Sequence, residues 1–220
     1  MIFLYLCMTK CMNMQETKDI SPYRQRLKTR IIETAMAAFA EKGVRAVKMD
    51  DVASALSISK RTLYEIYATK EVLLCEGLKV YAARREKDLT AATKDCRNVM
   101  EILLTIYKRK IEGSQHTSIM FYKDVVKYPM ALQFLKDQNE HNRELSQQFI
   151  KRGIQEGYFR SDLDYKLAGR LFEILGKYIM DNQLYEIYSI QELFHNLMFV
   201  SLRGVCTEKG VVELDRIMKG

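Results

Sequence analysis

The chain has 220 residues, 48% of them hydrophobic, so it is long enough for one domain, or for two small ones, around a buried core. Two prolines, ten glycines and long runs of Leu, Ile, Ala, Glu, Lys, Arg and Met predict an all-α protein, and the lack of alternating Val/Thr/Ile-rich runs argues against strands. The formal net charge of +7 suits a polyanionic partner but does not require one.

The five cysteines are scattered along the chain without a CxxC pair, and the three histidines are equally dispersed. This pattern predicts reduced thiols in a cytoplasmic protein that has no cofactor. A structural zinc site is not expected, because Cys7 and Cys11 have no second pair of ligands nearby. A redox-sensing thiol stays open as an alternative.

The first ten residues, MIFLYLCMTK, are largely apolar. This stretch is too short to span a membrane, and it lacks the basic region and the small-residue cleavage site of a signal peptide. We therefore expect residues 1–20 to be a disordered extension, with Met8, Met12 or Met14 as alternative translation starts, and we expect no membrane partner.

Three helices are predicted in the next part of the chain. The first begins near Pro22, where the missing N–H of proline costs nothing, and ends at Gly43. The second carries two aspartates in its first turn and is interrupted at Ser57. Ser59 is the predicted N-cap of the third helix, which covers residues 60–67.

Two short helices that are joined by a tight turn and preceded by a longer helix form a helix-turn-helix, here at about residues 48–67. In such a motif the second short helix enters the major groove of DNA, and its first turns carry the side chains that read bases. Ten lysines and arginines against five acidic residues lie between residues 20 and 70, a net charge of +5 that leaves +2 for the rest of the chain. The positive charge is therefore concentrated where a DNA duplex would dock.

Residues 27–74, LKTRIIETAMAAFAEKGVRAVKMDDVASALSISKRTLYEIYATKEVLL, resemble the DNA-binding domain of the TetR (tetracycline repressor) family. The resemblance is carried by the AxxxFAEKG end of the first helix, the MDDVA start of the second, the IS-KRTLY core and the closing K-E-x-L-L. It implies a DNA-binding domain at residues 21–70 and an effector-binding and dimerisation domain at residues 71–220. The residues that the resemblance implies for contacts with bases and phosphates are Lys48, Ser59, Lys60, Arg61, Thr62, Tyr64 and Lys70.

The sequence departs from the commonest pattern of the family at Ser57 and in YEIY, where family members often read YxHF and where Ile66 replaces a polar or histidine side chain. Ser57 stands where glycine is usual, which predicts backbone strain if the turn requires a positive φ. Glu65 would repel phosphate if it pointed at DNA, so we expect it to face solvent or a basic neighbour.

The implied DNA contacts also have structural alternatives. Lys60 and Arg61 could form a solvated helix face, and Tyr64 could be a half-buried packing residue. Lys70 could simply solvate the start of a helix, although a cation is disfavoured at that end, which favours a phosphate contact.

The rest of the chain continues as helices, about nine in all, of which the last is predicted over residues 189–210. The resemblance implies that the last two long helices pack against their copies in a homodimer, and the sequence provides more apolar surface there than one buried face needs. The residues predicted for this interface are Leu167, Leu171, Ile174, Leu175, Ile179, Leu193, Leu197, Met198 and Val200. Burial inside the subunit is the alternative for each of them.

The resemblance also implies that the helices between these two regions enclose a small-molecule pocket. Thirteen tyrosines and nine phenylalanines would suit an aromatic or lipophilic effector, although side chains at helical spacing can equally form plain core. The residues predicted to line the pocket are Ile106, Tyr107, Phe121, Tyr122, Val125, Tyr128, Phe134, Gln138, His141 and Phe172.

Together these features predict a cytoplasmic DNA-binding transcriptional regulator, in the form of a ligand-responsive repressor that binds a palindromic operator as a dimer. A helical enzyme is disfavoured, because the sequence contains no GxSxG, HExxH or Gly-rich phosphate loop and no Cys-His neighbourhood. An interaction protein that keeps the fold but has lost operator binding is the remaining alternative.

Overall fold

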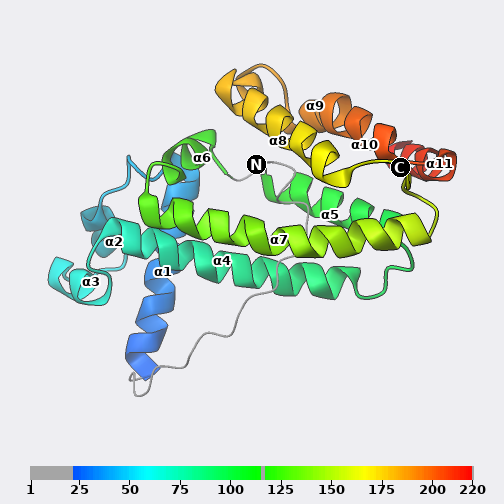
Figure 1. The fold of residues 1–220 in the computed structure, drawn as a ribbon. Helices are drawn as coiled ribbons and strands as arrows, with labels where there is room; N and C mark the ends of the chain where they lie inside the picture. Colours follow the sequence, from blue (N-terminus) through cyan, green and yellow to red (C-terminus); the bar gives the residue numbers. More distant parts are fainter. Residues whose placement is uncertain (1–21, 115–116, 220) are drawn as a thin grey trace. The chain divides into compact units, whose positions relative to one another are not determined.

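The computed structural model describes residues 22–114 and 117–219, and the extension predicted for residues 1–20 lies outside this described part. Helices joined by short turns make up the described residues, whose only β interaction is an isolated antiparallel bridge between Phe159 and Cys206 (Figure 1). The predicted all-α class is therefore confirmed. No helix in the described ranges is long and apolar enough to cross a lipid bilayer.

The chain separates into two compact units, the N-terminal unit with described residues 22–86 and 117–138, and the C-terminal unit with described residues 87–114 and 139–219. The division falls inside two long helices, α4 (Lys70–Thr93) and α7 (Pro129–Gln155), so each of them contributes residues to both units. The N-terminal unit therefore contains more than the helix-turn-helix region, because it includes a segment from the middle of the chain.

The N-terminal unit consists of one long helix, three short helices and one end each of α4 and α7. Its complete helices are α1 (Pro22–Lys42), α2 (Met49–Ala55), α3 (Lys60–Ile66) and α6 (Ile119–Val125). The first of them starts at a proline, as predicted, and ends before Gly43, whose φ of +84° suits glycine. Its buried side chains recur every three or four residues, which is the spacing of one helix face.

The hydrophobic core of the N-terminal unit joins α1, α2, α3, α6 and the starts of α4 and α7. Its most completely buried large side chains are Ile31, Phe39, Val44, Val52, Leu63, Leu73 and Leu74. Each buried side chain of this size contributes about 1.5–3 kcal/mol to folding. The single fully buried residue of α3, Leu63, fixes that short helix to the rest of the unit.

The C-terminal unit has its own core and holds the remaining helices. These are α5 (Val99–Ser114), α8 (Tyr165–Asp181), η2 (Leu184–Glu186), α9 (Ile190–Leu193), η3 (Phe194–Met198), α10 (Phe199–Val205) and α11 (Glu208–Lys219). The core combines Met100 from α5, Phe172 from α8, Met198 from η3 and Leu214 from α11. Asp164 starts α8, where its carboxylate accepts the N–H groups of the first turn.

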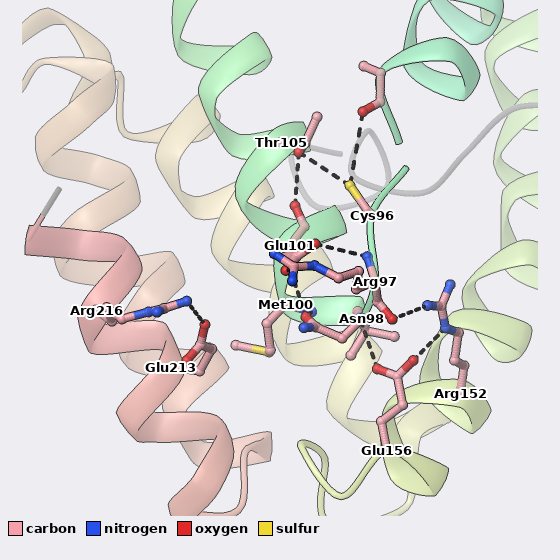
Figure 2. Close-up of polar contacts among 12 residues, drawn as sticks. Cys96, Arg97, Asn98, Met100, Glu101, Thr105, Arg152, Glu156, Glu213 and Arg216 are labelled. Carbon is pink, nitrogen blue, oxygen red and sulfur yellow. Dashed lines mark hydrogen bonds and ion pairs between the residues drawn. The ribbon is translucent and has the colours of Figure 1, made fainter. Parts of the chain in front are cut away.

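The connection from α4 to α5 is held by Arg152 of α7 and by Glu156, which directly follows that helix, as Figure 2 shows. Glu156 accepts the N–H of Val99 at 2.8 Å, and Arg152 donates both to Glu156 at 2.6 Å and to the carbonyl of Arg97 at 3.1 Å. Asn98 caps α5 by accepting the N–H groups of its first residues. These bonds satisfy the polar groups of the turn and fix its position within the C-terminal unit.

The structure differs from the sequence-based prediction at the end of the chain, where one helix is predicted over residues 189–210. The helical run there contains a π turn, η3, and ends at Val205, and a separate helix, α11, begins at Glu208. Thr207 separates the two, and its hydroxyl accepts the N–H of Gly210 at 3.2 Å as an N-cap. The prediction of one continuous helix was wrong. The predicted total of about nine helices is close to the number of helices in the described residues.

Candidate nucleic-acid interface

The turn between α2 and α3 contains a strained residue. Ser57 has a φ of +53°, in the left-handed region that favours glycine, as predicted from the family's usual glycine at this position. The turn is closed by hydrogen bonds from the N–H of Ser57 to the carbonyl of Ser54 at 3.0 Å and from the N–H of Ile58 to the carbonyl of Ala53 at 3.1 Å. This closed turn sets the angle at which α3 leaves α2.

The start of α3 is capped as the sequence predicts. The hydroxyl of Ser59 accepts the N–H of Thr62 at 3.0 Å, and the two hydroxyls lie 2.8 Å apart. Capping of this kind stabilises a helix by about 1 kcal/mol. A helix of only seven residues depends on such a cap and on tertiary packing, because it is too short to be stable by itself.

Two buried side chains hold α3, Leu63 within the helix and Tyr67 directly after it, and Ile66 is partly buried beside them. Leu63 and Tyr67 are buried in the core of the N-terminal unit, whereas Lys60, Arg61 and Tyr64 are exposed. Burial raises the pKa of Tyr67 to about 12, with the negative charge of Glu76 as a smaller cause, so its phenol stays neutral at physiological pH. The three exposed residues are among those predicted to contact DNA, whereas the predicted Thr62 is half-buried and the exposed Glu65 was not predicted to contact DNA.

Both exposed cations at the start of α3 already have carboxylate partners. Lys60 forms an ion pair with Asp50 of α2, and Arg61 donates to Glu65 one turn later at 2.8 Å. Hydrogen bonding to these carboxylates raises the pKa of Lys60 and the pKa of Arg61. The prediction that Glu65 faces solvent or a basic neighbour is confirmed.

The two remaining lysines assigned to DNA contacts lie in different surroundings. Lys48 is exposed just before α2, and its backbone N–H donates to the carboxylate of Asp51 at 2.8 Å. Lys70 is half-buried at the start of α4, and its Nζ donates to backbone carbonyls of the loop between α1 and α2. Loss of hydration lowers the pKa of Lys70.

Sequence analysis did not identify the partners of these cations. The spacing of four residues between Arg61 and Glu65 is a usable signal for a helix pair. No comparable signal links Lys60 to Asp50, because their pairing depends on how α2 and α3 pack. Asp124 of α6, which is 2% exposed and binds the N–H of Arg45 at 2.8 Å, also went unidentified.

The residues predicted for the dimer interface fall into three groups in the C-terminal unit. Leu167, Leu171, Ile174 and Val200 are exposed, while Leu175 and Leu197 are half-buried. Ile179, Leu193 and Met198 are covered within the chain itself. The exposed residues of α8, together with the exposed Tyr178, are spaced by four, three and four positions, which places them along one helix face.

The residues predicted to line an effector pocket are divided between the two units. Phe121, Tyr122, Val125, Tyr128, Phe134 and Gln138 belong to the N-terminal unit, and Ile106, Tyr107 and Phe172 belong to the C-terminal unit. The ring of Tyr107 meets that of Phe199 edge-on at 5.0 Å, and the amide oxygen of Gln138 is buried with no hydrogen-bond partner among the described atoms. The side chain of His141 lies outside the described residues.

Two of the cysteines are buried thiols. Burial raises the pKa of Cys206 to about 11. Burial is also the main cause of the raised pKa of Cys75. Neutral thiols are poor nucleophiles, so these two residues are poorly suited to redox sensing. Cys7 and Cys11 lie outside the described residues.

The chain is similar to known bacterial regulators. Residues 31–76 match the family described as "Bacterial regulatory proteins, tetR family", which confirms the resemblance seen in residues 27–74. The HTH-type transcriptional repressor KstR2 of Rhodococcus jostii (strain RHA1) is 32% identical over 149 residues, which cover 65% of this chain and 72% of that repressor.

Solved structures show the same fold. The ketosteroid transcriptional regulator KstR2 of Mycobacterium tuberculosis superposes with a TM-score of 0.55 and 23% identity, over 88% of this chain and 98% of that one. A putative transcriptional regulator from Saccharomonospora viridis, solved in complex with choline, superposes with a TM-score of 0.68 and 20% identity, over 84% of this chain and all of that one.

Proposed function

The chain belongs to the TetR family of bacterial regulatory proteins, and from this membership we propose that it is a repressor that reads operator DNA with α3. It is a DNA-binding transcriptional regulator and not an enzyme, because the relatives that establish the family are transcriptional repressors. In the proposed mechanism a homodimer binds the operator, and a small-molecule effector releases it.

The observation that carries the proposal is the exposed, cationic outer face of α3. Ion pairs between exposed side chains are worth only about 0–1 kcal/mol, so phosphate or base atoms can replace Asp50 and Glu65 as partners of Lys60 and Arg61 at small cost. The proposed DNA contacts are Lys48, Ser59, Lys60, Arg61, Thr62 and Tyr64. Lys70 is not among them, because its ammonium group is bound by backbone carbonyls.

We further propose that the dimer forms through the exposed apolar residues of α8 together with Val200 of α10. Leu167, Ile174 and Val200 are 66%, 64% and 63% exposed, and a row of such side chains is costly to leave in water. A Cβ added at Gly169 would meet nothing within 4 Å, which leaves room for a second subunit beside α8. Two-fold symmetry would place two copies of α3 on successive turns of one DNA face, about 34–36 Å apart.

The proposed effector is a lipophilic, steroid-like molecule. The side chains predicted to bind it are largely aromatic, which suits an apolar ligand. The Rhodococcus relative is a KstR2 repressor, and the Mycobacterium tuberculosis KstR2 structure is described as that of a ketosteroid regulator. Progesterone and androstenedione are therefore suitable first probes, with choline as a polar comparison.

The test is binding of the purified protein to the intergenic DNA upstream of its own gene, measured by fluorescence anisotropy at several salt concentrations. Wild-type protein should bind this DNA more tightly than a scrambled duplex, and K60A/R61A should lose about 1–3 kcal/mol of binding free energy for each of the two residues. The control K108A/R109A removes the same charge from an exposed part of α5 and should bind like wild type. Absence of salt-dependent binding by wild-type protein would favour the interaction-protein alternative.

A further inference from the structure

The loop between α1 and α2 is held by two charged side chains from other helices. Lys70 at the start of α4 donates through Nζ to the carbonyl oxygens of Val44 and Val47, both at 2.9 Å, and of Arg45 at 3.4 Å. Asp124 of α6 accepts the N–H of Arg45 at 2.8 Å. A cation therefore binds the acceptors of the loop, and an anion binds a donor of the same loop.

The carbonyls leave Lys70 with little capacity for DNA. A lysine ammonium has three N–H donors, and three carbonyl oxygens of one loop surround this one. The side chain is half-buried, and loss of hydration lowers the pKa of its ammonium. A phosphate could bind Lys70 directly only if the group first released the loop.

The carboxylate of Asp124 is nearly inaccessible to water. The residue is 2% exposed, and Nζ of Lys127 lies 3.4 Å from its Oδ1. A buried charge costs several kcal/mol unless it is paired and hydrogen-bonded, so its presence beside the loop points to a specific contact rather than to filling space. Its negative charge also stabilises the protonated form of Lys70.

The helix that carries Asp124 lies directly against the end of α1. The N–H of Ser118, just before α6, donates to the carbonyl of Ala40 at 2.7 Å. A Cβ added at Gly43 would lie 2.9 Å from the Cβ of Met120 and 3.1 Å from a carboxylate oxygen of Asp124. This close approach leaves the loop little freedom to shift while α6 stays in place.

We propose that Lys70 and Asp124 are positioning residues, which hold the α1–α2 loop between them and thereby fix the helix-turn-helix in its DNA-reading arrangement. The inference rests on the proposed function. It gives Lys70 a different role from the direct phosphate contact that the family resemblance implies. The loop leads directly into α2, so a movement of α4 or α6 would be passed on to α3 through these two side chains.

The first experiment compares the salt dependence of DNA binding in two variants. K70M keeps most of the length of the side chain but removes the ammonium, whereas R61A removes a proposed direct contact. K70M should weaken binding by about 2- to 30-fold while leaving the slope of log affinity against log salt near the wild-type value. R61A should reduce that slope by about 0.9 for each phosphate that the guanidinium neutralises. A reduction of the slope in K70M equal to that in R61A would overturn the inference.

The second experiment asks whether the two residues act through α3. D124N keeps an oxygen that can accept the N–H of Arg45, so it should bind DNA within about 2-fold of wild type, whereas D124A should resemble K70M. In a double-mutant cycle the effect of K70M should shrink by at least about half when Arg61 is already alanine, because residues that act together are not additive. Additive effects, or wild-type binding by D124A, would contradict the proposal.

A control separates positioning from a general loss of stability. L27A removes a core side chain of α1 away from the loop, so it should lower the unfolding temperature yet keep wild-type DNA affinity well below that temperature. Loss of affinity in L27A equal to that in K70M would mean that any destabilisation weakens DNA binding, and would overturn the inference. If wild-type protein bound no DNA at all, the proposed function itself would fail. If wild-type protein bound DNA and K70M reduced the salt slope as much as R61A, only the positioning role of Lys70 would fail.

Discussion

Ser57 occupies a backbone conformation that glycine adopts more readily, with φ at +53° in the turn of the helix-turn-helix. The left-handed conformation costs a residue with a Cβ about 1–2 kcal/mol, and glycine avoids this cost. Glycine also gives the unfolded chain more conformational entropy, which offsets part of the gain in stability. We expect S57G to raise the free energy of unfolding by about 0.5–1 kcal/mol, measured by urea denaturation. A decrease would show that the hydroxyl of Ser57 stabilises the turn more than its conformation destabilises it.

Tyr67 gives the stability of the N-terminal unit a dependence on alkaline pH. Its pKa is raised to about 12, so the folded state keeps the proton that the unfolded chain releases near its ordinary pKa of about 10. The contribution of Tyr67 is fully present below about pH 10 and is lost as the pH rises through about 12. Between about pH 10 and pH 12 the folded state binds more protons than the unfolded state, so the free energy of unfolding falls as the pH rises.

The variant Y67F has no phenol to ionise and should resist this loss. Between pH 9.5 and 11.5 the wild-type protein should lose about 2 kcal/mol more unfolding free energy than Y67F, measured by denaturant titration. Cys206, with its pKa raised to about 11, is present in both proteins, so its contribution cancels in the difference. Equal losses would mean that the Tyr67 hydroxyl reaches water in the folded state.

At the scale of whole elements, α3 has the character required of a helix that enters a groove. It is seven residues long, capped by Ser59 and anchored by Leu63, and its first turns present Lys60, Arg61 and Tyr64 to solvent. Each of these features can be read from the sequence, because a serine N-cap, a basic first turn and a lone buried leucine are local signals. The ion pair between Lys60 and Asp50 could not be predicted in the same way, since it depends on the crossing of α2 and α3.

The last helices show the opposite case, in which local signals misled the prediction. The run from Ile190 to Val205 has Gly204 in its last turn but no proline after it, and the sequence was interpreted as a helix that continues to Gly210. The break at Cys206 is instead fixed by the antiparallel bridge to Phe159. Thr207 followed by Glu208 is the signal that could have indicated the start of α11.

The exposed apolar face of α8 predicts the oligomeric state. L171D/I174D places two charges on this face, and we expect a monomer by light scattering at micromolar concentrations at which wild-type protein should be a dimer. Both residues are exposed in the single chain, so its helical content should persist. The control Q147D/Q148D adds the same charge to exposed positions of α7 and should remain dimeric, and a dimeric L171D/I174D would place the interface elsewhere.

For the whole molecule, the sequence predicted the fold class and the helix that is proposed to contact DNA, α3. It did not predict the contacts of the buried and half-buried charged side chains. The resemblance assigned Lys70 to phosphate by its position, whereas the loop carbonyls around its Nζ belong to residues 23 to 26 positions away. Backbone acceptors are present at every residue, so no pattern of side chains indicates such a contact. The same holds for Asp124, whose partner is the backbone N–H of Arg45, 79 positions away.

The central claim is that two copies of α3, joined through α8, read two half-sites of one operator. Hydroxyl-radical footprinting of the intergenic DNA upstream of the gene tests it most directly. We expect two protected segments related by a dyad, with centres about one helical turn, roughly 34–36 Å, apart on one face, and we expect both to disappear with K60A/R61A. A single protected segment, or protection that K60A/R61A leaves unchanged, would contradict the claim.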